Sequence, residues 1–339
     1  MKYYDKIMPG RKVVVGVGSA LIDILAHEND AFVERVGAVK GGMTYVDKQV
    51  IDRTIEWATH APQIVPGGSA CNTMVGIGEL GGRARFVGKC GNGHMGQLFR
   101  SGLEKHHVEP RLFASDSPTG RVLSIITPDA QRSMLTYLGA SAEARPDELS
   151  AVPLDDAAVV HIEGYLLFNR ALMLAVLEAA KKAGARISLD LASFNVVEEA
   201  RDILPDIIAQ YVDILIANED ESMAYTGIRD EAKALEYLGR HVDLAVLKLG
   251  ARGSRIAFQD KQLAIRSHGD GSAVDTTGAG DLWASGFLFG LVNQMPLAQC
   301  GSLGSQCGYA VCQVVGASIP AEKWGTIRKD MEDGWQKIG

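Results

Sequence analysis

The second half of the chain alternates short apolar runs with longer segments of helical periodicity. One such segment, Ala171–Gly184, ends in Lys-Lys-Ala-Gly, which is typical of the C-terminal end of a helix. Because strands that alternate with helices form a parallel sheet covered on both faces, the pattern predicts a three-layer α/β/α body with a mainly parallel central sheet. Such sheets bind ligands beyond the carboxyl ends of their strands. The predicted strands of this body are Val13–Gly18, Ala157–Ile162, Arg186–Leu191, Asp213–Ala217 and Leu244–Leu249.

Two segments in the first half differ from this pattern. Residues 19–48 and 111–138 lack helical periodicity, and the second of them divides into Val122–Thr127 and Ser133–Leu138 around a Pro-Asp turn. Two β-rich runs joined by such a turn predict a hairpin. Between the two segments, helices are expected at 47–59, 72–80 and 97–106. We therefore predict a small, discontinuous β-sheet lid of residues 19–48 and 111–138, inserted into a body of residues 1–18, 49–110 and 139–339.

Charge and cysteine content argue against several classes of protein. Lys and Arg number 34 and Asp and Glu 41, a net charge of −7, which offers no positive surface to nucleic acid or an anionic membrane. The five cysteines show no Cys-x-x-Cys spacing, which favours reduced thiols. The opening residues lack a signal-peptide pattern, and no run reaches about 18 apolar residues. We expect a soluble cytoplasmic protein with no nucleic acid or membrane partner.

The most informative glycine-rich segment is Asp275–Asp281, in a chain with 38 glycines, about 11% against a usual ~7%. Its sequence, Asp-Thr-Thr-Gly-Ala-Gly-Asp, precedes an apolar run over 282–292. Small residues just before a helix leave the first backbone N–H groups uncovered, and such groups bind anions. A single Asp at this place is more often a helix cap. Two Asp residues that flank small residues favour a catalytic, anion-binding turn instead.

This segment resembles the second signature of the PfkB (ribokinase-like) carbohydrate kinase family. The resemblance, which extends from Val13 to about Pro320, implies a ribokinase-like fold and phosphoryl transfer from Mg·ATP to an alcohol. It also implies that Gly278, Ala279 and Gly280 form an anion hole and that Asp281 is the catalytic base, with Thr277 on the ATP side. These roles agree with phosphoryl transfer, which depends mainly on positioning and charge stabilisation.

Two segments of the first half resemble the acceptor-binding parts of the family. Gly67-Gly68-Ser-Ala-Cys-Asn72 is similar to the first signature, and Asp23 follows the first strand where the family holds sugar hydroxyls. Taken alone, the first segment is equally well a glycine turn with Asn72 as a helix N-cap, and Asp23 is equally well a turn residue. The adenosine-kinase branch is the most similar, although Ser19 stands where adenosine kinases carry Asn. The resemblance then assigns the acceptor to Ser19, Asp23, Met43, Gly67, Gly68, Asn72, Leu138 and Tyr165.

Two later segments resemble the nucleotide side of the family. Asn218-Glu-Asp-Glu221 matches the N-x-x-E motif, in which the Asn and the final Glu organise Mg²⁺ and phosphate through water. Alone, acidic residues after a strand are more often part of a helix N-terminus. Lys248-Leu-Gly250-Ala-Arg-Gly253 is similar to the ATP-binding strand and turn. The family often carries Thr in place of Lys248, so this residue is either a phosphate contact or a surface residue.

One glycine motif supports a competing hypothesis. Gly91-Asn-Gly-His-Met-Gly96 satisfies G-x-G-x-x-G, follows a strand-like run and precedes a helix, with Asp116 about twenty residues beyond. An NAD-dependent dehydrogenase would carry such a fingerprint, but here Pro110 interrupts the unit and Asp116 lies beside a turn. Together with the glycines at 67–68, 250–253 and 278–280, this motif is expected at a turn that faces a single cleft.

The sequence thus predicts an ATP-dependent kinase for a primary hydroxyl of an adenosine-like nucleoside or a sugar. Asp23, Gly68 and Asn72 would hold the acceptor diol while the lid closes, and Asp281 would take the proton. The expected ions are Mg²⁺ with ATP and, as in some relatives, K⁺ near Asp275 and Thr277. Fructose, ribose or a sugar acid as acceptor, a non-catalytic kinase-like regulator and the dehydrogenase remain open alternatives. A monomer and a homodimer both remain open.

Overall fold

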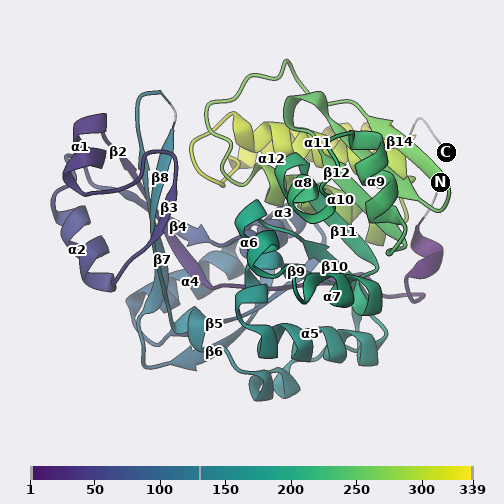
Figure 1. Cartoon of the computed structure of the whole chain (residues 1–339), viewed down its shortest axis with the longest axis horizontal. Coiled ribbons are helices and arrows are strands. Elements are labelled where there is room, and N and C mark those ends of the chain that lie inside the picture. The colour runs from purple at the N-terminus through teal and green to yellow at the C-terminus, as the bar shows by residue number, and fades with distance from the viewer. Residues whose placement is uncertain (1–2, 130, 337–339) are drawn as a thin grey trace.

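The computed structural model describes residues 3–129 and 131–336 and contains two β-sheets (Figure 1). In the larger sheet, every neighbouring pair from β12 through β6 is parallel, whereas β13 is antiparallel to both of its neighbours. This arrangement confirms the mainly parallel central sheet. In spatial order its strands are β14 (Lys261–Ile265), β13 (Ser254–Phe258), β12 (Leu244–Lys248), β11 (Ile214–Asn218), β10 (Arg186–Asp190), β9 (Ala157–Glu163), β1 (Val13–Val17), β5 (Arg83–Gly91) and β6 (Val108–Ser115).

Helices cover both faces of this sheet, because successive buried side chains of each strand point to opposite faces. Val14 packs into one core and its neighbour Val15 into the other. The first core includes residues of α3 (Ser69–Glu79), α4 (His94–Lys105), α10 (Ala279–Val292), α11 (Leu297–Cys312) and α12 (Ala321–Gln336). The second is covered by α5 (Arg170–Ala183), α6 (Phe194–Glu199), α7 (Leu204–Tyr211), α8 (Glu219–Thr226) and α9 (Glu231–Gly239). The predicted three-layer α/β/α body is confirmed.

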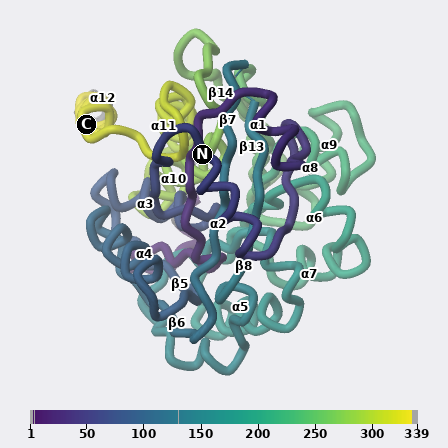
Figure 2. The backbone as a smooth tube through the Cα atoms, turned by 90° about the vertical axis from the view of Figure 1, so that its left-hand side faces the viewer, coloured from purple at the N-terminus to yellow at the C-terminus, as the bar shows by residue number. Residues whose placement is uncertain are grey.

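The smaller sheet stands at one side of the body and mixes parallel and antiparallel pairs (Figure 1). Its strands, in spatial order, are β3 (Met43–Tyr45), β8 (Arg132–Gly139), β7 (Thr119–Ile126), β2 (Leu21–His27) and β4 (Gln63–Gly67). Two helices, α1 (Asp30–Arg35) and α2 (Lys48–Glu56), lie on its outer side, as Figure 2 shows from the direction of this sheet. The predicted hairpin is present as β7 and β8, which pair antiparallel.

The two sheets and their helices differ from the predicted boundaries at three places. Most of α2, expected in the body, lies on the small sheet, where Asp52 accepts a hydrogen bond from Arg121 of β7. Gln63–Gly67, expected in the body, forms β4 and pairs with β2 in the small sheet. Residues 111–115, expected in the lid, belong to β6, which pairs in parallel with β5 of the large sheet. Pro110, which was expected to interrupt the dinucleotide-binding unit, lies within β6 and is tolerated because β6 is an edge strand, where a missing N–H costs no ladder bond.

Several helices are too short for hydrophobic periodicity in the sequence to predict them. The six-residue helix α1 lies inside 19–48, where no helix was expected, and it is capped by the side chain of Asn29, which accepts from the N–H of Phe32. It is too short to show a repeat. Short 3₁₀ helices lie at Tyr4–Lys6, Ala140–Glu143, Pro146–Ala151, Gly164–Phe168 and Gly250–Arg252.

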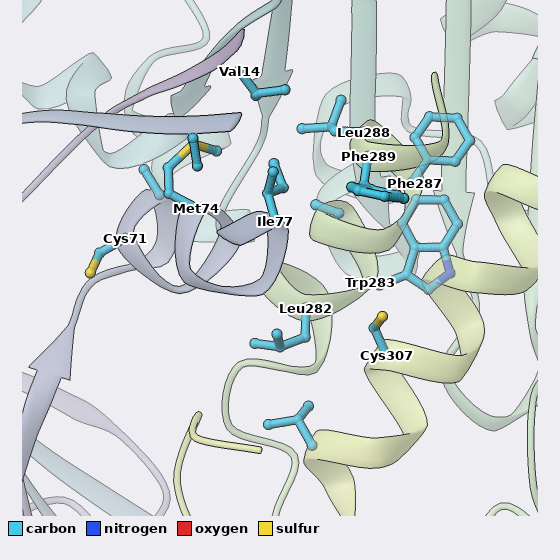
Figure 3. Packing of buried hydrophobic residues seen from close by; sticks show 14 of the residues in the cluster. Val14, Cys71, Met74, Ile77, Leu282, Trp283, Phe287, Leu288, Phe289 and Cys307 are labelled. Atoms are coloured by element: carbon cyan, nitrogen blue, oxygen red, sulfur yellow. The ribbon is translucent and has the colours of Figure 1, made fainter. Parts of the chain in front are cut away.

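The helix that follows the Asp275–Asp281 turn is held by close packing on two sides. Figure 3 shows Met74 and Ile77 of α3 in one apolar cluster with Leu282 and Phe289 of α10. On the other side α10 approaches α11 so closely that a Cβ on Gly286 would lie 2.7 Å from the carbonyl oxygen of Leu303. The position of α10, and of the turn at its N-terminus, therefore depends on small residues at this contact.

We expect Gly286→Ala to destabilise the protein by about 1–3 kcal/mol, because the added methyl group has no space between α10 and α11. Gly325→Ala is the matched control, since Gly325 is exposed on α12 and an added Cβ meets no atom within 4 Å. That variant should be unchanged or more stable by up to about 1 kcal/mol. Urea unfolding measures both, and equal stabilities would show that the helix contact has room for a side chain.

Candidate active site

A cavity lies between the small sheet and the carboxyl ends of the parallel strands, and we call it the inter-sheet cavity. It brings together residues from the whole length of the chain. Of the predicted acceptor residues, all but Gly67 line it: Ser19, Asp23, Met43, Gly68, Asn72, Leu138 and Tyr165. Thr277, Gly278, Ala279, Gly280, Asp281, Asn218, Glu221 and Lys248 line it as well.

A second cavity, which we call the adjacent cavity, lies next to the first and is lined partly by α10 and α11. The predicted ATP-side residues Gly250 and Gly253 line it, whereas Thr277 does not. The two cavities share five residues: Asn218, Lys248, Thr276, Ala279 and Gly280. A group that passes from one cavity to the other would cross at these residues.

The turn between Asp275 and α10 is fixed by a buried carboxylate. Asp275 accepts hydrogen bonds from the N–H and hydroxyl of Thr277, at 2.9 and 2.6 Å, and from the N–H of Gly316, at 2.8 Å. Burial opposes ionisation, but these hydrogen bonds hold the pKa of Asp275 below its usual value. Gly278 adopts a left-handed conformation with φ of 72° as the N-cap of α10. The first turn of α10 is thereby placed at both cavities, with N–H groups that have no acceptor inside the helix.

Asp281 is held by two residues of α3. Its carboxylate accepts from the Ser69 hydroxyl at 2.8 Å and from the Asn72 side-chain amide at 2.9 Å. Burial raises the pKa of Asp281, while the hydrogen bonds from Asn72 and Ser69 oppose the rise. Ser69 was missed by the sequence reasoning, although its place directly after the glycine pair could have indicated it. The result is an oriented carboxylate with increased proton affinity at the start of α10.

The glycine pair at 67–68 is required by two close approaches. A Cβ on Gly67 would lie 2.3 Å from the carboxyl carbon of Asp23, and one on Gly68 would lie 2.4 Å from the carbonyl oxygen of Ser19. Gly68 also has φ of 99°, which other residues rarely adopt. Burial raises the pKa of Asp23 to about 7, with Arg132 opposing the rise and Asp281 adding to it. Gly67 thus lies behind Asp23 rather than in the cavity wall.

Glu163, at the end of β9, is a second residue that the sequence reasoning did not assign to the site. It is 1% exposed and accepts from the backbone N–H groups of Ser19, at 2.8 Å, and Ala70, at 3.0 Å. Burial raises its pKa to about 6, and the two N–H donors limit the rise. Glu163 therefore ties the segment before β2 and the start of α3 to the large sheet.

Arg132, on β8 of the small sheet, is a third such residue. Its guanidinium donates a hydrogen bond to the hydroxyl of Thr277 in the turn before α10. The sequence signal was a single basic residue in a strand of the hairpin, which is too common to indicate a site. This contact joins the small sheet to the Asp275–Asp281 turn across the cavity.

Asn218 and Glu221 form a reciprocal capping box at the start of α8. Asn218 accepts from the N–H of Glu221, whose carboxylate in turn accepts from the N–H and side-chain amide of Asn218, at 2.8 and 2.7 Å. The helix-terminus interpretation of this segment is therefore correct locally, yet both residues also line the inter-sheet cavity. Burial raises the pKa of Glu221 to about 7, with Lys248 opposing the rise.

A hydrated Mg²⁺ fits this carboxylate. Mg²⁺ prefers oxygen ligands, keeps several waters and binds substrate phosphates together with one or two carboxylates. Within residues 3–129 and 131–336, no group of three or more His, Cys, Asp or Glu residues could hold a metal ion directly. Glu221 at the cavity wall is thus suited to a water-mediated contact rather than to a dedicated protein cage.

Lys248, at the end of β12, is not a surface residue. Its side chain is 13% exposed, and its ammonium group lies 2.8 Å from a carboxylate oxygen of Asp190, at the end of β10. The surface-residue alternative is therefore wrong. The sequence reasoning also missed Asp190, which follows an apolar run and gave no separate signal.

The glycines at 91–96 do not face either cavity, contrary to the expectation of one shared cleft. A Cβ on Gly91 would lie 2.4 Å from the carbonyl oxygen of Ser117, and one on Gly96 would lie 1.9 Å from that of Gly91. These glycines permit a tight turn to pack against the segment before β7. Packing thus explains two of the three glycines of the dinucleotide fingerprint, whereas a Cβ on Gly93 would meet no atom within 4 Å.

The two adjoining cavities at the carboxyl ends of the parallel strands are typical of a small-molecule binding site, and comparison with known proteins shows the family. The chain belongs to the PfkB family of carbohydrate kinases, because a family model described as "pfkB family carbohydrate kinase" matches residues 38–324. The predicted family and the ribokinase-like fold with a small-sheet lid are confirmed. The chain is accordingly an ATP-dependent kinase of a sugar or nucleoside.

Among curated relatives, the chain is 32% identical over 244 residues to "Probable fructokinase-2" of Arabidopsis thaliana, covering 68% of this chain and 72% of the relative. Among solved structures, it is 29% identical to a probable sugar kinase from Rhizobium etli, with a TM-score of 0.87 and coverage of 95% and 99%. An adenosine kinase from Sinorhizobium meliloti gives 29% identity, a TM-score of 0.86 and coverage of 95% and 100%. These results leave the dehydrogenase and the non-catalytic regulator without support.

PfkB kinases use ATP with Mg²⁺, which agrees with the fit of Glu221 described above. Among the residues that the structure describes, no helix is long and apolar enough to cross a membrane.

Glu163 should make the stability of the protein depend on pH between about 4.5 and 6. In this window the folded protein holds a proton that the unfolded chain has lost, so the free energy of unfolding falls as the pH rises. A difference of about 1.5 pKa units corresponds to about 2 kcal/mol. Glu163→Gln removes this titration, and its free energy of unfolding should fall less steeply across the window.

Urea unfolding at several pH values between 4.5 and 6.5 measures the slope. Glu198→Gln is the matched control, because Glu198 is exposed on α6, and it should keep the wild-type slope. A Glu163→Gln variant with the wild-type slope would contradict the raised pKa of Glu163.

Proposed function

We propose that this protein transfers the γ-phosphate of ATP to the primary hydroxyl of an adenosine-like nucleoside. The observation that carries the proposal is the mixed lining of the inter-sheet cavity, in which a few polar side chains stand among many apolar and aromatic ones. Asp23, Asn72 and Asp281 are polar lining residues. The apolar and aromatic lining residues include Leu21, Met43, Tyr45, Met134, Leu138, Tyr165, Phe168 and Leu172.

A nucleoside matches both kinds of lining residue. Its ribose carries a diol and a hydroxymethyl group on one side, and its base presents a flat face that apolar and aromatic side chains can cover. A free hexose carries hydroxyls around its whole ring, and those placed against apolar side chains would lose hydrogen bonds to water without replacement. The similarity to the adenosine kinase from Sinorhizobium meliloti supports the same acceptor. The fructokinase relatives favour a sugar as the second candidate.

In the proposed reaction, Asp23, Gly68 and Asn72 hold the acceptor diol while the small sheet covers the cavity. The hydroxyl oxygen attacks the γ-phosphorus in line, and Asp281 accepts its proton. The raised pKa of Asp281 favours this role, because a base with greater proton affinity removes a hydroxyl proton more readily. The N–H groups of Gly278 and Gly280 would stabilise the charge that develops on the transferred group. The N–H of Ala279, predicted as a third donor, already donates to the carbonyl oxygen of Thr276 at 3.1 Å.

ATP would lie in the adjacent cavity, with its phosphates directed to the shared residues. Gly250 and Gly253 would let the backbone approach the nucleotide, since both have positive φ, 54° and 92°. Mg²⁺ would neutralise phosphate charge next to Asn218 and Glu221. A K⁺ site near Asp275 and Thr277 stays a prediction, and both carboxylate oxygens of Asp275 already accept hydrogen bonds. The monomeric or homodimeric state and the cytoplasmic location also stay predictions.

A substrate panel with Mg·ATP tests the acceptor. We expect ADP release with adenosine to exceed that with fructose, ribose and a 2-keto-3-deoxy sugar acid by at least about 100-fold in kcat/KM, because several apolar contacts to the base are then gained. Inosine and cytidine, included in the same panel, show how strongly the base is recognised. A higher kcat/KM for fructose or ribose would replace the nucleoside by a sugar as the acceptor.

Asp281→Asn should reduce kcat by about 10²- to 10⁴-fold, which is the usual loss when a positioned base is removed. The variant keeps the shape of the side chain, so the melting temperature and the affinity for a non-hydrolysable ATP analogue should stay close to wild type. Steady-state kinetics with the best acceptor of the panel and calorimetric titration provide the two measurements. A near-normal kcat would rule out Asp281 as the base.

A further inference from the structure

We propose that Lys248 binds the phosphoryl group while it is transferred, and that Asp190 is the positioning residue that aims the Lys248 ammonium at it. This proposal rests on the phosphoryl transfer proposed above and holds whichever alcohol is the acceptor. It assigns a role to a residue that differs from the Thr often present in the family, and to a carboxylate that the proposed mechanism leaves unused.

The first argument is location. Lys248 lines both the inter-sheet cavity and the adjacent cavity, and of the five residues that the cavities share it alone carries a charged side chain. The transferred phosphoryl group is the part of the substrates that leaves the nucleotide and joins the acceptor. It must therefore cross where the two cavities meet.

The second argument is contact with the start of α10. The Lys248 ammonium lies so close to Gly280 that a Cβ there would be 3.0 Å from it. It is thus next to the first turn of α10, where backbone N–H groups lack acceptors within the helix. A lysine and a helix N-terminus that face the same space both favour an anion.

The third argument is the hydrogen-bonding capacity of Lys248. An ammonium group has three N–H donors. Among the described residues, Asp190 is its one hydrogen-bond partner, at 2.8 Å. Asp190 is itself held, because its other oxygen accepts from the N–H of Ala192 at 3.0 Å. Asp190 therefore fixes the direction of one donor and leaves two for phosphate oxygens.

The fourth argument is charge. Asp190, Glu221 and Asp281 all contribute negative charge at the Lys248 ammonium, which keeps it protonated even though burial acts against the charge. A triphosphate entering beside these carboxylates would be repelled without a compensating cation. Lys248 provides that cation in addition to the one that Mg²⁺ supplies, as phosphoryl transfer requires.

The proposed step is balanced without further reactants. A bond forms between the acceptor oxygen and the γ-phosphorus, and the bond from that phosphorus to the β,γ-bridging oxygen breaks. ADP leaves with that electron pair, and the acceptor proton goes to Asp281. Lys248 keeps its protons throughout and only stabilises the oxygens of the group in transfer.

A nucleotide-binding experiment tests the contact without an acceptor. In Lys248→Met, the affinity for the non-hydrolysable analogue AMP-PNP with Mg²⁺, measured by calorimetry, should fall by about 10-fold or more, as expected for loss of a charged hydrogen bond. The affinity for ADP should change less than about 3-fold. Lys261→Met, on the exposed strand β14, is the control and should match wild type. Equal losses for AMP-PNP and ADP, or no loss for either, would overturn the proposal.

A kinetic experiment separates this role from that of a structural counter-ion. Lys248→Met leaves a buried carboxylate unpaired and should lower the melting temperature, and the double variant Lys248→Met with Asp190→Asn should restore it. We expect kcat to stay reduced by about 10²-fold or more in both, since one stabilising donor is missing. If the double variant recovers kcat together with stability, Lys248 is a counter-ion and the proposal is wrong.

The positioning role of Asp190 has its own readout. Asp190→Asn alone should lower kcat about 10-fold, with the KM of the acceptor unchanged. In the Lys248→Met background it should have no further effect on kcat, because Asp190 acts through Lys248. Independent losses that multiply would overturn this role. If adenosine fails as a substrate, the best acceptor of the panel is used, and the AMP-PNP measurement stands by itself.

Discussion

The hydrogen bonds from Ser69 and Asn72 to the carboxylate of Asp281 join two glycine-rich turns. The bonded residues lie 212 and 209 positions apart in the chain. They exist because α3 and α10 pack side by side, with Gly76 of α3 so close to Ser285 and Leu282 that a Cβ there would lie 2.3 Å from the Ser285 hydroxyl oxygen. The glycine turn at 67–68, the turn before α10 and Asp281 therefore keep their geometry as one unit. A change in the spacing of these helices would alter all three together.

The second constraint is electrostatic. Burial raises the pKa values of Asp23, Glu163, Glu221 and Asp281, all of which line the inter-sheet cavity. Only two basic side chains, Arg132 and Lys248, line the same cavity in the described part of the chain. An acidic site of this kind favours a triphosphate only when a metal ion accompanies the triphosphate and the few basic side chains point toward it. Hydrogen bonds from the Arg132 guanidinium to Thr277 and from the Lys248 ammonium to Asp190 hold both basic groups in place.

The large sheet and the glycine-rich turns could be predicted from the sequence, because buried parallel strands are continuous apolar runs and an anion-binding turn needs small residues in a local pattern. The sheet to which β4 and residues 111–115 belong could not be predicted. Gln63–Gly67 is a five-residue edge strand that contains a proline and shows no clear alternation of apolar and polar residues. Ser69, Arg132, Glu163 and Asp190 were missed for a different reason. Each matters through a partner far away in the chain, and such pairs exist only once the strands are in register.

The division of labour between the two sheets accounts for the disagreement between relatives. The parts that would bind phosphate belong to the large-sheet body and lie in local motifs that resemble family signatures: the turn before α10 and the ends of β11 and β12. Much of the cavity wall proposed to bind the acceptor, including Leu21, Met43 and Met134, comes from three separate strands of the small sheet. Side chains on such strands can change without disturbing the turn. Fructokinases and an adenosine kinase can therefore resemble this chain about equally, and the acceptor must be inferred from the chemistry of the small-sheet wall.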